Sequence, residues 1–151
     1  MKIASCDAGV SGAVCLWDTD TNDLKLFDMP INDDRQLDTP KFFHLLLDFE
    51  PDGLITEFTI RPISLVRQTG EIMAVAKLLQ CDLKVAAVNS WKVRMLGENT
   101  NDKQKSIDRA KELFPDVNFI RPRGRKPSHD WCEAAIMARY YYDLQPKAKS
   151  K

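Results

Sequence analysis

Residues 2–18, KIASCDAGVSGAVCLWD, carry the strongest structural signal in the chain. Residues 2–7 (KIASCD) form a short apolar run that predicts a buried strand, and residues 8–12 (AGVSG) supply turn glycines. Residues 13–18 (AVCLWD) predict a second strand, and residues 24–28 (LKLFD) alternate as a third. Consecutive short strands separated by turn residues predict an antiparallel meander at the start of the chain.

The rest of the chain alternates between helical and strand patterns. Residues 39–49 predict a helix with Thr39 as its N-cap and Pro40 at its first position. The other predicted elements are a strand over 53–58, a helix over 64–80, a strand over 84–88, helical segments near 90–96 and 102–114, and a last helix over 127–144 capped by Ser128. This order predicts an α/β protein with a mixed five-stranded sheet and helices on both faces, the architecture of the ribonuclease H-like fold.

Length and composition bound the kind of protein. The 151 residues suit one compact domain, which we place at residues 1–145, followed by a short basic tail at residues 146–151 that we expect to be disordered. No apolar run approaches the roughly 20 residues of a membrane helix, and the apolar stretch at the N-terminus is too short for a secretory signal. We therefore expect a cytoplasmic protein with no membrane partner. Its four cysteines have no C-x-x-C spacing, so we expect buried reduced thiols.

Charge is strongly segregated along a chain whose net charge is zero. Residues 1–83 contain seven Lys and Arg against fourteen Asp and Glu, whereas residues 84–151 contain fifteen against eight. A polarised chain of this kind can present a basic face to nucleic acid while remaining neutral overall. Chance segregation over a solvated surface is the alternative.

Two acidic residues come directly after apolar strands. Asp7 ends the first strand and Glu57 ends the fourth. If these strands are parallel neighbours, both carboxylates emerge at the same carboxyl edge, where open α/β sheets bind their ligands. Either acid alone would be read as a turn or capping residue; the pair is more informative, because a buried acid is costly unless it is paired or ligated.

Two further acids, Asp130 and Glu133, lie three positions apart at the start of the last helix and therefore share one face. Favourable interaction with the helix dipole would also explain them. Packing of this apolar helix on the sheet would bring them towards Asp7 and Glu57. Four carboxylates in one place need cations, and Mg²⁺ prefers such oxygen ligands. Two ions would suit hydrolysis of a phosphodiester bond.

Basic residues gather in two stretches of the second half of the chain. The first contains Lys92, Arg94, Lys103, Lys105, Arg109 and Lys111. The second contains Arg121, Arg123, Arg125 and Lys126, immediately before the last helix. The second stretch must lie near Asp130 and suits binding of phosphates around a cleaved bond, although a solvated loop would read similarly.

Three motifs resemble one family, the RuvC Holliday junction resolvases, and most closely their small bacteriophage-encoded branch. They are Asp7-Ala8-Gly9-Val10-Ser11-Gly12-Ala13, Thr56-Glu57 and His129-Asp130-Trp131-Cys132-Glu133-Ala134. Ser90-Trp91-Lys92 and the segment Lys103–Pro115 are also similar to that branch. The resemblance spans nearly the whole chain.

The resemblance implies a homodimeric endonuclease that cuts four-way DNA junctions by paired nicks. It implies that Asp7, Glu57, Asp130 and Glu133 are catalytic residues that bind Mg²⁺, or Mn²⁺ in its place, and two ions in each active site are expected. Many relatives have Asp at the position of Glu133, and some use His among the four active-site positions. We interpret His129 as a supporting or phosphate-contacting residue. Arg61, Arg67, Lys92, Lys103, Lys105, Arg121, Arg123, Arg125 and Lys126 are the candidate DNA contacts.

The resemblance also places the segment after Glu57 at the junction centre and the dimer interface, where Gly70 would allow close helix approach at a two-fold axis. The fold does not fix the substrate. An RNA–DNA hybrid, a flap or a structured RNA are therefore alternative substrates of the same nuclease. A junction binder without catalysis and half of a sugar-kinase-like ATPase are further alternatives, and the chain has room for only one of the two domains that the last requires.

Overall fold

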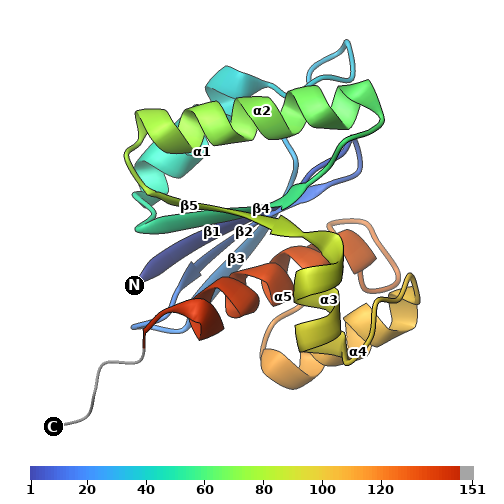
Figure 1. The fold of residues 1–151 in the computed structure, drawn as a ribbon. Helices are drawn as coiled ribbons and strands as arrows, with labels where there is room; N and C mark the ends of the chain where they lie inside the picture. The colour runs from blue at the N-terminus through green and yellow to red at the C-terminus, as the bar shows by residue number, and fades with distance from the viewer. Residues whose placement is uncertain (147–151) are drawn as a thin grey trace, which may run out of the picture.

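The computed structural model describes residues 1–146. Its elements are β1 (Lys2–Asp7), β2 (Ala13–Asp18), β3 (Asp23–Asp28), α1 (Thr39–Phe49), β4 (Gly53–Phe58), α2 (Ile63–Leu78), β5 (Asp82–Ala87), α3 (Val88–Leu96), α4 (Lys103–Leu113) and α5 (His129–Leu144) (Figure 1). Every predicted strand and helix is present, with ends shifted by a few residues. The predicted basic tail lies, from residue 147 onwards, outside the described residues.

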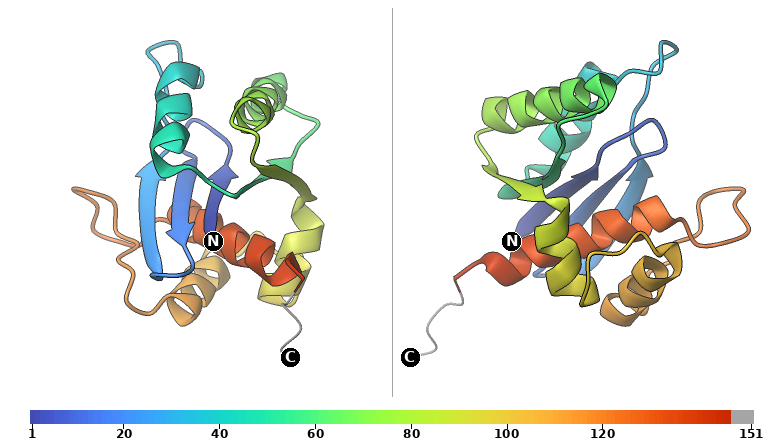
Figure 2. Two further views of the ribbon diagram at one scale, coloured as in Figure 1. Left: turned by 90° about the vertical axis from the view of Figure 1, so that its left-hand side faces the viewer. Right: turned by 45° about the vertical axis from the view of Figure 1, so that its right-hand side comes forward.

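The five strands form one mixed sheet in the order β3-β2-β1-β4-β5. β1 pairs with β2 and β2 with β3 in antiparallel fashion, whereas β1–β4 and β4–β5 are parallel. Helices α1 and α2 cover one face of the sheet, and α5, α3 and α4 lie on the other (Figures 1 and 2). The predicted α/β architecture, a ribonuclease H-like fold with an antiparallel meander and a parallel half, is confirmed.

Alternation along the strands divides the apolar residues into two cores. In β1, Ala4 and Cys6 face α1 and α2, whereas Ile3 faces α5. In β4, Leu54 belongs to the α1–α2 side and Ile55 to the α5 side. Since side chains alternate between the two faces of a strand, Asp7 and Glu57 have the parity of Ile3 and Ile55. Both acids therefore emerge on the face that α5 covers.

Helix α5 is fastened to the sheet along its length. Ser5 Oγ of β1 donates a hydrogen bond to the carbonyl of Ala134, and the Tyr141 hydroxyl donates to Asp82 Oδ2 at 2.6 Å. A Cβ placed on Gly53 would lie 2.0 Å from the Tyr141 hydroxyl oxygen, so any larger residue at the start of β4 would force the Tyr141 ring to shift. These contacts fix where the first turn of α5 meets the sheet edge.

The helix caps differ from the prediction in one place. The prediction of Thr39 as the N-cap of α1 is wrong. Asp38 is the cap, and its side chain accepts a hydrogen bond from the Lys41 amide at 3.1 Å. Pro40 is therefore the second residue of the helix instead of the first. A carboxylate one residue earlier offers a stronger acceptor than the Thr39 hydroxyl, which instead donates to Glu71 at 2.6 Å. Ser128 caps α5 as predicted.

Cysteine burial follows the prediction for three of the four residues. Cys6, Cys15 and Cys132 are buried free thiols, and burial raises the pKa of each. Cys81 is only half-buried, because it lies in the turn that leads into β5. Within residues 1–146, none of the helices is both long enough and apolar enough to cross a membrane.

Candidate active site

The carboxyl edge of the β1–β4 pair brings two of the predicted acids together. Cys6 pairs with Thr56 in the parallel register, so Asp7 and Glu57, the next residues of the two strands, leave the sheet side by side. The Thr56 hydroxyl donates to the carbonyl of Cys6 at 3.2 Å and reinforces this pairing. The parallel pairing that the sequence could only assume is therefore present.

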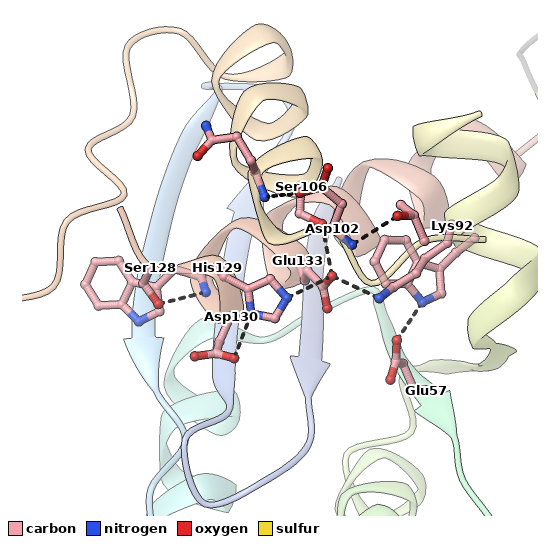
Figure 3. Close-up of polar contacts among 12 residues, drawn as sticks. Glu57, Lys92, Asp102, Ser106, Ser128, His129, Asp130 and Glu133 are labelled. Atoms are coloured by element: carbon pink, nitrogen blue, oxygen red, sulfur yellow. Dashed lines mark hydrogen bonds and ion pairs between the residues drawn. The ribbon is translucent and has the colours of Figure 1, made fainter. Parts of the chain in front are cut away.

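Asp130 and Glu133 approach this edge from the first turn of α5. The Ser128 side chain accepts from the Trp131 amide at 3.3 Å and sets the start of the helix. Asp130 is half-exposed on the outer side, whereas Glu133 is buried. In Figure 3 the Glu133 side chain lies between Glu57, at the end of β4, and Asp130, at the start of α5.

Asp7 has the most demanding electrostatic environment of the four acids. Burial raises its pKa well above the usual value, and the negative charges of Glu57, Glu133 and Asp130 raise it further. None of the described residues donates a hydrogen bond to its carboxylate. An acid that is surrounded by other acids and has no donor is stabilised most directly by a bound cation.

Glu57 is held by a buried tryptophan. Trp91 Nε1 of α3 donates to Glu57 Oε1 at 2.7 Å, and the indole is fully buried. Burial raises the pKa of Glu57, the hydrogen bond from Trp91 opposes the increase, and the charge of Glu133 adds to it. The tryptophan therefore fixes the carboxylate without neutralising it.

Three donors converge on a single oxygen of Glu133. Lys92 Nζ of α3 and His129 Nε2 each lie 3.1 Å from Oε1, and the Ser106 hydroxyl of α4 donates to the same atom at 3.0 Å (Figure 3). Burial alone would raise the pKa of Glu133, but the contacts with His129 and Lys92 outweigh it and hold the pKa below its usual value. Glu133 is therefore ionised.

Asp130 has a different pair of partners. His129 Nδ1 lies 3.2 Å from Oδ1 and Arg121 Nη2 lies 3.2 Å from Oδ2. The hydrogen bond from His129 is the main reason that the pKa of Asp130 is below its usual value. In return, the hydrogen bonds to Asp130 and Glu133 raise the pKa of His129 to about 9, so that the imidazole is charged at neutral pH.

Arg121 ties this side of the site together. Its Nη2 donates to the carbonyl of Ser11 in the β1–β2 turn at 2.7 Å, and its Nε lies 2.8 Å from Asp28 Oδ1 at the end of β3 in an ion pair that lacks hydrogen-bond geometry. Asp28 also accepts from Trp131 Nε1 at 2.9 Å. The predicted DNA contact at Arg121 is therefore also a structural link between three segments.

The donor chemistry of the site fits a divalent cation, but the side chains are not arranged as a finished ligand set. Among the described residues, no group of three or more His, Cys, Asp and Glu side chains is close enough to hold one ion. The unpartnered carboxylate of Asp7, amid three other acids, is the observation that fits a hard cation. The predicted assignment of Asp7, Glu57, Asp130 and Glu133 as metal ligands stays a prediction.

The predicted DNA contacts differ in their exposure. Arg121 is half-buried and Lys92 is buried, whereas the other seven are exposed: Arg61, Arg67, Lys103, Lys105, Arg123, Arg125 and Lys126. Arg67 and Lys105 form ion pairs with Glu71 and Glu98. The loop that carries Arg123, Arg125 and Lys126 extends from the body of the protein beside the start of α5, in orange in Figure 2.

The position of the Lys92 side chain contradicts the assignment of Lys92 as a DNA contact. Its side chain is only 8% exposed and is directed at Glu133 instead of at solvent. The physical reason is that α3 packs against α5, so a residue that the sequence places in a basic stretch lies inside the protein. The other two predicted DNA contacts of that stretch, Lys103 and Lys105, are exposed.

The end of β4, the segment after it and helix α2 together present an uncovered apolar surface next to the site. Phe58, Ile60, Ile63 and Val66 are exposed, and a Cβ on Gly70 would have no neighbour within 4 Å. The opposite face of the helix is buried through Ile72 and Val75. The predicted dimer interface therefore corresponds to an exposed surface.

Sequence reasoning gave no role to Trp91 or Ser106, which contact Glu57 and Glu133. One signal was present for Trp91: it follows β5, the strand next to the one that ends in Glu57, and a buried indole N–H needs an acceptor. No local signal identifies Ser106, because its contact depends on how α4 packs against α5.

Comparison with known proteins places the fold. No protein-family model matches the chain, and no curated protein matches it. Among solved structures, it is similar to RuvC of Thermus thermophilus, with a TM-score of 0.66 and 12% identity over 95% of this chain and 96% of that one. It is also similar to T. thermophilus RuvC in complex with a Holliday junction substrate, with a TM-score of 0.61 and 15% identity over the same shares. The chain has a RuvC-like fold.

Proposed function

We propose that this protein is a metal-dependent endonuclease that resolves four-way DNA junctions by paired hydrolysis of phosphodiester bonds. The convergence of Asp7, Glu57, Asp130 and Glu133 at one edge of a RuvC-like fold carries the proposal. The similar T. thermophilus RuvC binds a Holliday junction substrate, which supports branched DNA as the substrate class. A basic loop beside the acids supports a polyanionic substrate.

Asp7, Glu57, Asp130 and Glu133 would hold the metal, which we propose to be two Mg²⁺ ions per site, with Mn²⁺ able to replace them. When bound, these ions would activate a water molecule and stabilise the leaving oxygen of the scissile phosphate. Trp91, Lys92 and Ser106 keep two of the carboxylates oriented. Charged His129 and Arg121 contact Asp130 at the outer side of the site, where they can also bind phosphate oxygens.

The partner and setting follow from the same surfaces. Arg123, Arg125 and Lys126, together with Lys103 and Lys105, would bind the phosphate backbone on either side of the cut. A second copy of the chain would cover the exposed apolar part of α2, so that two active sites act on opposite strands. We propose action in the cytoplasm, that of the host cell if the protein is encoded by a bacteriophage.

The decisive experiment is cleavage of a synthetic four-way junction by the wild-type protein and by Asp7→Asn in the presence of Mg²⁺. We expect Asp7→Asn to lose cleavage, about 10³-fold or more, while it still binds the junction in Ca²⁺. Asp18→Asn is the matched control, because Asp18 also ends a strand of this sheet but lies at the opposite edge. Nicking by Asp7→Asn at the wild-type rate would rule out the assigned metal site.

The choice of substrate is tested separately. The wild-type protein is incubated with a junction, a flap, an RNA–DNA hybrid and a linear duplex of matched sequence. Preferential paired cutting of the junction supports a resolvase. Equal cutting of the linear duplex, or preference for the hybrid, would reject the junction while leaving the nuclease assignment in place.

A further inference from the structure

Helices α3 and α4 form a layer of donors behind the two glutamates of the site. Trp91 donates to Glu57 Oε1, and Ser106 donates to Glu133 Oε1 beside Lys92 and His129. In both glutamates every contact falls on the same oxygen. Within residues 1–146, no donor contacts Oε2 of either residue, as the dashed lines of Figure 3 also show.

Both donors are held rigidly. Trp91 is fully buried in the core that α5 forms with the sheet, and Ser106 is 1% exposed on the buried side of α4. The short contacts, 2.7 Å from Trp91 and 3.0 Å from Ser106, are within normal hydrogen-bond range. A rigid donor that binds one carboxylate oxygen fixes the rotation of the group, and with it the direction of the other oxygen.

We propose that Trp91 and Ser106 are positioning residues that hold Oε1 of Glu57 and Oε1 of Glu133, which leaves Oε2 of each glutamate to bind the divalent ion. This inference rests on the proposed function, since it assigns a role within that metal site. Asp130 differs from the glutamates, because both of its oxygens are already contacted, by His129 and Arg121. The glutamates are therefore the acids that the protein has prepared in advance for ligation.

The test measures binding of Mn²⁺ alone to the full-length protein by titration calorimetry, without DNA. We expect Trp91→Phe to raise the Kd for Mn²⁺ about 10-fold or more, because it removes the only donor to Glu57 Oε1 among the described residues. We expect Ser106→Ala to raise it about 3- to 10-fold, since Lys92 and His129 still contact Glu133.

Trp17→Phe is the matched control. Trp17 is also a buried indole in the same core, but its Nε1 donates to Asn22, at 3.2 Å, instead of to an acid of the site. We expect it to lower the thermal stability of the metal-free protein as Trp91→Phe does, while its Kd for Mn²⁺ stays within about twofold of the wild type. Metal affinity thus separates positioning from a general structural role.

The outcomes are distinct. If the wild-type protein binds Mn²⁺ and Trp91→Phe binds it as tightly as Trp17→Phe does, the positioning role is wrong and the metal site stands. If the wild-type protein binds no Mn²⁺, the proposed metal site itself is wrong and the positioning role with it. Should Trp91→Phe not fold, as judged by circular dichroism, Ser106→Ala decides: an unchanged Kd would overturn the inference.

Discussion

The ion pair between Lys92 and Glu133 gives a quantitative test of the site. The two charges lie 3.1 Å apart and each side chain is only 8% exposed. At an effective dielectric constant of about 20, their gross attraction is about 5 kcal/mol. Desolvation offsets most of this energy, so the measurable quantity is the cost of leaving one charge without its partner, about 3–5 kcal/mol for a buried pair.

The loss in unfolding free energy on removing one member of the pair depends on which partners the remaining charge keeps. In Lys92→Met, Glu133 keeps His129 and Ser106, so we expect a loss of about 2–3 kcal/mol in the free energy of unfolding. That loss corresponds to a decrease in Tm of about 4–12 °C for a chain of this size. In Glu133→Gln, Lys92 loses its carboxylate, and we expect about 3–4 kcal/mol. The double variant loses less than the sum, with a coupling energy of about 2–3 kcal/mol.

The assay is urea unfolding of the four proteins, followed by far-UV circular dichroism in EDTA at about pH 7. The pair Arg139–Asp143 on α5, with a separation of 3.0 Å and half-buried side chains, is the control cycle, for which we expect about 0.3–0.5 kcal/mol. A coupling energy for Lys92 and Glu133 no larger than that of the control would refute the buried pair. Lys92 would then be directed outwards, as the sequence had predicted for a DNA contact.

Three further outcomes are expected. Asp7→Asn should raise the Tm of the metal-free protein at about pH 7 by about 2–8 °C, because burial and three neighbouring acids raise the pKa of Asp7 and so make this carboxyl group costly to the folded state. A decrease in Tm in scanning calorimetry would contradict this. The raised pKa of His129 means that the charged imidazole stabilises the folded state below about pH 6.5 and that this stabilisation is lost as the pH rises through about 9. In EDTA, the Tm of His129→Gln should therefore decrease less than the Tm of the wild type between these two pH values. Gly53→Ala should cost about 1–3 kcal/mol in urea unfolding, because its Cβ would meet Tyr141, and a neutral effect would show that α5 is not fastened there.

Much of the fold could be read from local patterns. Short apolar runs bounded by turn residues gave the strands, and apolar spacing gave the helices, because burial of one face imposes a period of two or of about 3.6 residues. The helix ends were less certain. The sequence predicted the N-cap of α1 at Thr39, whereas Asp38 is the cap and the Thr39 hydroxyl donates to Glu71, a contact made only in the folded chain.

The candidate site, like the fold, was predicted from the sequence only in part. The sequence by itself determined that Asp7 and Glu57 follow apolar strand runs and that Asp130 and Glu133 share a helical turn, because position within an element is a local property. The placement of Asp7 and Glu57 at one sheet edge required the parallel pairing of β1 with β4. Tertiary structure alone decided which charges meet. A lysine from a basic stretch lies buried on Glu133, and a tryptophan from another helix holds Glu57. The reason is physical: the contacts of a charged side chain depend on which surfaces pack together, and composition along the chain does not encode that packing.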